Sequence, residues 1–175
     1  RLIGDKGVRE FAEAARRLKQ LYPQASFRLA GWFDDSPDGI RADELARMEA
    51  GGVEYLGKLD DIRPALAAAS VFVLPSRYRE GTPRTLLEAA SSGKPIITTD
   101  VPGCNHVVVD QYNGLLCRMK DSEDLAAKMR ALADCDDEKL AQFGRNGRSK
   151  MEAEYDENLV INKYLRALEA FRKAS

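Results

Sequence analysis

The chain has 175 residues, enough for one domain with its own core, since a domain takes about 100–200 residues. Hydrophobic residues make up 44% and charged residues 31%, and no apolar run approaches the ~20 residues of a membrane span, which excludes disordered and transmembrane chains. The 27 basic and 28 acidic residues sum to a net charge of −1, and without a basic excess we expect no nucleic-acid binding.

Short apolar runs alternate with segments of helical periodicity. In chain order the sequence predicts a helix at 7–22, a strand at 27–30, a helix around 44–48, a strand at 53–56, a helix at 62–69, a strand at 71–74, a helix at 83–92, strands at 95–99 and 114–117, and helices at 121–133, 137–152 and 158–173. The uniformly apolar run at 71–74 is typical of a central strand buried on both faces of a parallel sheet. We therefore expect an α/β fold, a Rossmann-like parallel sheet with helices on both faces and extra C-terminal helices, the last one packed on the side.

In sheets of this kind, ligands bind outside the carboxyl ends of the strands. The loops to inspect therefore follow residues 30, 56, 74 and 99. None of them carries the Gly-x-Gly-x-x-Gly pattern of dinucleotide-binding domains or the Gly-x-x-x-x-Gly-Lys-Ser/Thr pattern of P-loop enzymes. The sequence therefore argues against both classes.

The densest polar segment is 80–88, Glu-Gly-Thr-Pro-Arg-Thr-Leu-Leu-Glu, between the apolar strand and the next helix. Pro83 suits the first turn of a helix, where its missing N–H costs nothing. The N–H groups of Arg84, Thr85 and Leu86 should then be free to bind a phosphate at the positive end of the helix dipole.

Two glutamates frame this segment. Glu88 lies one turn into the helix, where its carboxylate can accept both hydroxyl protons of a ribose. Glu80 lies in the loop, where it can meet the hydroxyls of a sugar attached beyond the phosphates. The alternative is that Glu80 is a solvated loop residue and Glu88 an exposed helix residue.

A second polar segment, Arg1-Leu-Ile-Gly-Asp-Lys6-Gly7, precedes the first helix. If its turn follows a strand, the two cations Arg1 and Lys6 can converge on a diphosphate, one as a planar fork and the other as a compact charge. Two exposed cations without a role are the alternative. The chain also begins without a methionine, inside this motif, and we expect it to be a piece of a longer protein.

Several motifs together point to one family. They are Arg1-Leu-x-x-x-Lys6-Gly7, the run at 71–76, the two glutamates of 80–88 with seven residues between them, the sequence Glu-Ala-Ala-Ser-Ser-Gly-Lys-Pro-Ile-Ile at 88–97, and Asn-Gly-Leu-Leu at 113–116. In this combination residues 1–133 resemble the C-terminal, donor-nucleotide-binding domain of retaining glycosyltransferases of family 4, the group 1 glycosyl transferases with the GT-B fold. The Arg-Glu-Gly-x-Pro-Arg variant is similar to bacterial enzymes that build lipid-linked surface oligosaccharides.

The resemblance implies roles for these residues. The catalytic residues would be Arg1 and Lys6, which hold the donor diphosphate, and Glu80, which lies beside the donor sugar. The remaining residues implied in donor binding are Leu59 (in a loop that would face the nucleobase), Gly81, Thr82, Pro83, Arg84, Thr85, Leu86 and Glu88. The chain departs from the family at two positions, since many relatives have a glycine in place of Pro83 and a glutamate in place of His106.

The resemblance also implies a function. The protein would transfer a sugar, with retention, from a nucleotide-diphosphate sugar, most of all a UDP-sugar, to a lipid-linked or saccharide acceptor in bacterial surface polysaccharide synthesis. Residues 1–175 would form a single nucleotide-sugar-binding domain that is inactive without an N-terminal acceptor domain. No Asp-x-Asp site is evident, so we expect no cofactor and no metal requirement.

Two other functions remain open, a non-catalytic nucleotide-sugar-binding module that regulates a partner and a sugar-nucleotide epimerase. The two glutamates together with the two cations favour the transferase. Three cysteines at irregular spacing (Cys104, Cys117 and Cys135) suit a reducing compartment better than a disulfide framework or a zinc site. We therefore expect a cytoplasmic protein, with a peripheral place on the inner face of the cytoplasmic membrane if the missing domain takes a lipid-linked acceptor.

Overall fold

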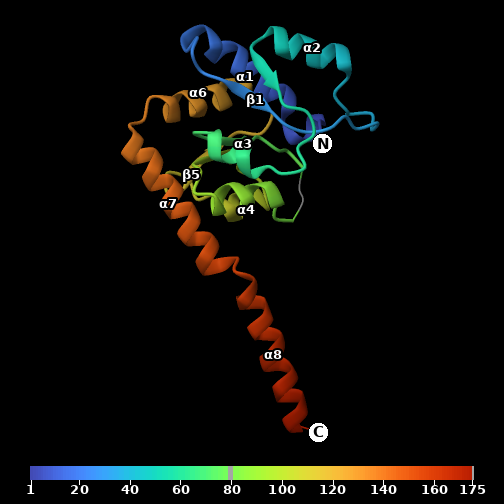
Figure 1. Ribbon diagram of the computed structural model, residues 1–175, viewed down its shortest axis with the longest axis vertical. Helices are drawn as coiled ribbons and strands as arrows, with labels where there is room; N and C mark the ends of the chain where they lie inside the picture. The colour runs from blue at the N-terminus through green and yellow to red at the C-terminus, as the bar shows by residue number, and fades with distance from the viewer. Residues whose placement is uncertain (79–80, 175) are drawn as a thin grey trace.

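The structure is a computed structural model that describes residues 1–78 and 81–174 (Figure 1). Its elements are the 3-10 turn η1 (Gly4–Lys6), α1 (Val8–Leu21), β1 (Phe27–Leu29), α2 (Ala42–Ala50), β2 (Val53–Tyr55), α3 (Arg63–Ala68), β3 (Phe72–Leu74), α4 (Arg84–Ser91), β4 (Ile96–Thr99), α5 (Cys104–Val107), β5 (Gly114–Cys117), α6 (Ser122–Ala133), α7 (Asp137–Glu154) and α8 (Glu157–Ala174). Every predicted strand and helix is present near its predicted bounds. The short α5 was not predicted, because four residues are too few to show a helical period.

The strands pair in parallel, as predicted, but in two groups. One sheet pairs β1 with β2, and the other has the order β3-β4-β5. The expectation that 71–74 is a central strand is wrong within this sheet, where β3 pairs with β4 alone and the fully buried β4 is central. An apolar run reports what covers the faces of a strand and carries no information about its edges, which is why the sequence could not show this.

Helices cover both faces of the three-stranded sheet, with α1 and α6 on one side and α4 on the other (Figure 1). Successive side chains of a strand point to opposite faces. Accordingly Ile97 packs in the core beneath α1 and α6, whereas Ile96 packs with Leu86 of α4 and Val107 of α5. Ile97 belongs to the larger of two apolar clusters, and Ile96, Leu86 and Val107 belong to the smaller one. Strand β4 therefore contributes side chains to both clusters.

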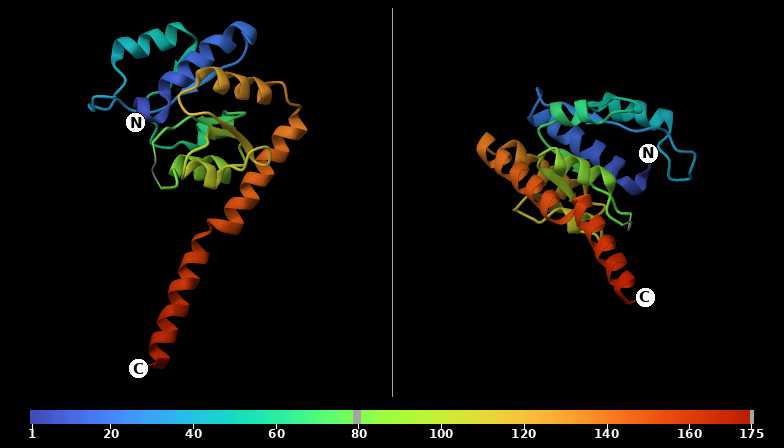
Figure 2. Two further views of the ribbon diagram at one scale, coloured as in Figure 1. Left: turned by 180° about the vertical axis from the view of Figure 1, so that it is seen from behind. Right: turned by 60° about the horizontal axis from the view of Figure 1, so that its bottom comes forward.

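The two C-terminal helices differ in their packing. Helix α7 crosses α4, whereas α8 extends away from the rest of the molecule in every view (Figure 2). The predicted packing of the last helix on the side is therefore wrong. Its apolar residues at positions 159, 160, 161, 164, 165 and 168 are exposed. An amphipathic period predicts that a helix has an apolar face, and it does not tell what covers that face.

Candidate functional site

A cavity of about 1220 Å³ lies between β1 and β3. Most of its wall is apolar and comes from these two strands and from α1 and α3. Its polar members include Arg1 and Lys6 from the N-terminal turn and Arg84 and Thr85 from the start of α4, with Gly7 and Pro83 beside them. Further polar residues come from other parts of the wall, and they are Gln24, Ser26, Arg28, Ser70 and Asp137. The structure thus brings the two predicted cations to the cavity where the helix after β3 begins.

The turn that carries Lys6 has a conformation that its neighbours impose. Gly7 ends η1 and precedes α1 in the left-handed region, with φ +74°. A Cβ atom at this position would come within 2.2 Å of the Pro75 carbonyl oxygen, so only glycine fits against the end of β3. The Gly7 N–H donates to the Gly4 carbonyl at 2.8 Å and closes the turn.

The two cations differ in their surroundings. Arg1 is exposed, and its Nη1 atom lies 3.3 Å from Asp34 Oδ2. Lys6 is half-buried, and burial lowers the pKa of its ammonium group; the charge of Arg1 acts in the same direction, whereas Cys104 and Asp5 oppose it. Because burial disfavours the charged form of Lys6, an anion that reaches the ammonium group stabilises that form.

Sequence analysis missed the acidic residue that supports this turn. Asp38 Oδ2 accepts the N–H of Asp5 at 2.7 Å, and Asp38 Oδ1 accepts Arg9 Nη1 at 2.8 Å. Burial alone would raise the pKa of Asp38, but the hydrogen bonds from Arg9 and Asp5 outweigh burial and lower it. Asp38 lies 33 residues after Asp5 in a loop of Asp, Pro and Gly, and no local pattern marks it.

The start of α4 differs from the prediction in one respect. Pro83 is the N-cap and Arg84 the first helical residue. The Pro83 carbonyl accepts the Leu86 N–H at 3.0 Å, so the expectation that this N–H is free is wrong, because the cap carbonyl takes the first intrahelical bond. Among the described residues, none is found to accept the N–H groups of Arg84 and Thr85. Two donors therefore remain at this helix end, while the Leu86 side chain is buried in the core.

Glu88 lies outside the cavity wall on the next turn of α4. Its Oε1 atom accepts Arg84 Nε at 2.9 Å, and its side chain is 30% exposed, against 89% for Arg84. Of the other predicted residues, Gly81 and Thr82 are exposed and Leu59 is partly buried after β2, and none of the three lines the cavity. Glu80 lies outside the described residues.

Asp-x-Asp does occur once, as Asp134-Cys135-Asp136, which the sequence analysis overlooked. The structure explains both carboxylates without a ligand. Asp134 accepts the Tyr22 hydroxyl, and Asp136 caps α7 by accepting the Lys139 N–H at 2.7 Å. Across residues 1–78 and 81–174, no three His, Cys, Asp or Glu side chains are grouped so that they could hold a metal ion.

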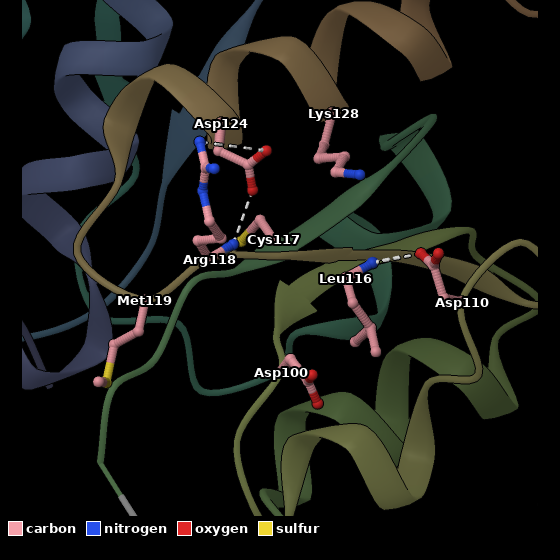
Figure 3. Close-up of a pocket in the computed structure, with 8 residues that line it drawn as sticks. All are labelled: Asp100, Asp110, Leu116, Cys117, Arg118, Met119, Asp124 and Lys128. Carbon is pink, nitrogen blue, oxygen red and sulfur yellow. Dashed lines mark hydrogen bonds and ion pairs between the residues drawn. The ribbon is translucent and has the colours of Figure 1, made fainter.

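A second hollow, of about 550 Å³, lies beside β5 (Figure 3). Asp110 Oδ1 accepts the Leu116 N–H at 2.8 Å, and Asp124 Oδ2 accepts the Arg118 N–H at 2.7 Å. Because β5 is the last strand of its sheet, these carboxylates satisfy N–H groups that no neighbouring strand can reach. The hollow is explained by the edge of the sheet and is not a candidate site.

Comparison with known proteins decides the family. The sequence model described as Glycosyl transferases group 1 matches residues 1–135. The chain belongs to this family. Solved relatives are GT-B glycosyltransferases, and the chain matches their C-terminal half, so the expected fold and family are confirmed.

Two bacterial glycosyltransferases resemble the chain over most of its length. N,N'-diacetylbacillosaminyl-diphospho-undecaprenol alpha-1,3-N-acetylgalactosaminyltransferase of Campylobacter jejuni is 37% identical over 166 residues, which cover 95% of this chain and 42% of the relative. UDP-Gal:alpha-D-GlcNAc-diphosphoundecaprenol alpha-1,3-galactosyltransferase of Escherichia coli is 31% identical over 156 residues, 86% of this chain and 39% of the relative. The chain thus spans about two fifths of the length of these relatives.

Among solved structures, HepE from Anabaena in complex with UDP aligns with a TM-score of 0.83 and 23% identity. The alignment covers 97% of this chain and 47% of HepE. At this identity the likeness shows the fold alone. Among the helices that the structure describes, none is both long and apolar enough to cross a membrane.

Proposed function

We propose that this chain is the donor-binding half of a retaining glycosyltransferase that uses a UDP-linked sugar. The observation that carries the proposal is the shared cavity wall of Arg1, Lys6 and the first turn of α4 at the carboxyl end of β3. Two cations and two backbone N–H groups form a cradle for a diphosphate. The name of the Escherichia coli relative, which specifies UDP-Gal, and the UDP bound to HepE support the choice of a UDP-sugar.

The donor-binding half contributes electrostatic stabilisation to the reaction. The bond between the sugar C1 and the β-phosphate oxygen breaks, and a bond from C1 to the acceptor oxygen forms on the same face. The departing phosphate oxygen takes the acceptor proton. Negative charge grows on the diphosphate in this step, and Arg1, Lys6 and the start of α4 stabilise it. The site needs no metal for this purpose, because the cations already neutralise the leaving group.

The two glutamates have separate tasks in this proposal. Glu88, at the edge of the cradle, accepts the ribose hydroxyls, for which it exchanges its ion pair with Arg84. Glu80 orients the hydroxyls of the donor sugar, a role that rests on its place in the family motif. The acceptor is a lipid-linked diphosphate saccharide, which the names of the Campylobacter and Escherichia relatives support. The residues that bind the acceptor belong to the other half of the protein. Because the acceptor is lipid-linked, the protein works at the membrane surface.

Steady-state kinetics of the full-length protein with UDP-sugars tests the proposal. Lys6→Ala should lower kcat about a hundredfold, since one preorganised charge contact is worth about 3 kcal/mol in the transition state. Lys163→Ala, an exposed lysine of α8, is the matched control and should leave kcat unchanged. The rate should be the same with and without EDTA, and the product should keep the anomeric configuration of the donor.

Three results would contradict parts of this proposal. A normal kcat in Lys6→Ala removes the leaving-group role. A rate abolished by EDTA removes metal-free catalysis. UDP-sugar binding without transfer to any acceptor favours the non-catalytic regulatory module instead.

A further inference from the structure

Arg77, directly after β3 and Pro75-Ser76, reaches across to the turn that precedes α1. Its backbone N–H donates to the Asp5 carbonyl at 2.8 Å, and its Nε donates to Asp5 Oδ1, also at 2.8 Å. The Ser76 hydroxyl also donates to the Asp5 carbonyl, at 3.2 Å. Main chain and side chain of one residue thus bind another that lies 72 positions away in the sequence.

Asp38 completes a closed arrangement around Asp5. It accepts the Asp5 N–H, its own carbonyl accepts the Gly4 N–H at 2.9 Å, and its Oδ2 atom lies 3.4 Å from Arg77 Nη2. The carbonyl, N–H and carboxylate of Asp5 are therefore all engaged. Lys6 follows Asp5 directly, so the direction in which the Lys6 side chain leaves the backbone depends on this arrangement.

Arg77 itself is not placed to bind an anion. Its side chain is 25% exposed and lies among the carboxylates of Asp5, Asp38 and Glu10, whose Oε1 atom is 3.8 Å from Arg77 Nη1. The other oxygen of Glu10 is buried and has no hydrogen-bond partner among the described residues. Three carboxylates more than offset the charge of the guanidinium, so Arg77 acts on the turn and not on a phosphate.

We propose that Arg77 is a positioning residue that holds the Asp5–Lys6 turn in register with the start of α4, so that Lys6 meets the diphosphate of the donor. This inference rests on the proposed function, which makes Lys6 a diphosphate ligand. The planar fork of arginine is required, because it reaches Asp5 and Asp38 at the same time. A lysine at this position keeps the charge and loses the second contact.

Binding measurements on the full-length protein test the role, with UDP and uridine as the two probes. Arg77→Lys and Arg77→Ala should each weaken UDP binding about tenfold or more and leave uridine binding unchanged, because uridine has no phosphate for Lys6 to meet. Arg47→Ala is the matched control, since Arg47 forms a single exposed ion pair with Asp43. It should bind both probes as the wild type does.

Three outcomes would overturn the inference. One is UDP affinity in Arg77→Lys equal to that of the wild type, since this variant keeps the charge and is the more conservative for folding. Another is an equal loss for uridine and UDP, which indicates general damage to the fold. The third is unchanged UDP affinity in Lys6→Ala, which removes the proposed function as well. The first outcome together with a loss of affinity in Lys6→Ala removes only the positioning role.

Discussion

Gly144 of α7 lies directly against Gly93, which follows the last turn of α4. A Cβ atom at position 144 would come within 2.0 Å of the Gly93 carbonyl oxygen. Gly147, one turn further along α7, faces Ala90 with room to spare, since its added Cβ would sit 3.8 Å from the nearest atoms. The close approach of α7 to α4 thus requires a glycine at position 144 and not at position 147.

Replacing these glycines should have opposite effects on stability. Gly144→Ala should lower the free energy of unfolding by about 1–3 kcal/mol, because the backbone of Gly93 has to move. Gly147→Ala should leave it unchanged or raise it by up to about 1 kcal/mol, because alanine is the better helix residue. Urea unfolding followed by circular dichroism measures both. Equal effects of the two substitutions would show that the contact with Gly93 does not limit the packing.

The cysteines should differ in reactivity. Burial raises the pKa of the Cys117 thiol to about 12, with Asp124 adding to the effect. Because only the thiolate is alkylated, about one Cys117 in 10⁴ is reactive at pH 8. Cys135 is partly exposed, at the end of α6. Iodoacetamide at pH 8 should therefore label Cys135 in the folded protein and leave Cys117 unlabelled until denaturant is added. Labelling of Cys117 at the same rate would contradict its burial.

UDP affinity should depend on alkaline pH through Lys6. The pKa of this group is lowered in the free protein, chiefly by burial, and a bound diphosphate favours the charged ammonium. Affinity should therefore be full below the lowered pKa and fall as the pH rises through it, earlier than for an ordinary lysine.

Lys6→Arg is the matched control for this prediction, because an arginine side chain stays charged throughout the alkaline pH range. Calorimetric titrations between about pH 7 and pH 10 measure the UDP affinity of both proteins. Ionisation of the uracil base of UDP affects both affinities alike, so it does not contribute to the difference between them. Affinities that fall in parallel would mean that Lys6 does not carry the dependence.

Glu88→Ala should weaken UDP binding about tenfold or more, because hydrogen bonds to a charged group contribute about 1.5–3 kcal/mol each. The loss should shrink with 2′-deoxy-UDP, which lacks one of the ribose hydroxyls that Glu88 accepts. Glu152→Ala is the matched control, since it removes the carboxylate of an exposed i,i+4 ion pair with Arg148 on α7, away from the cavity wall, and should leave the affinity unchanged. Unchanged UDP affinity in Glu88→Ala would take Glu88 out of the site.

The sequence by itself determined the secondary structure and the family. Each predicted strand is present because short apolar runs bounded by Gly and Pro have few other ways to bury their side chains. The spacing of Arg1 and Lys6 around a glycine turn, and of Pro83 before a helix, likewise records local backbone chemistry. Such signals are complete within a few residues and can be read from them.

Only the tertiary structure decided which distant residues meet. Asp5, Asp38 and Arg77 are joined by hydrogen bonds across 33 and 72 positions, and none of them stands in a pattern that names its partner. The edge position of β3 and the extension of α8 away from the domain escaped the sequence for the same reason. Periodicity describes which face of an element is apolar, while the neighbour that covers that face or edge depends on the path of the whole chain.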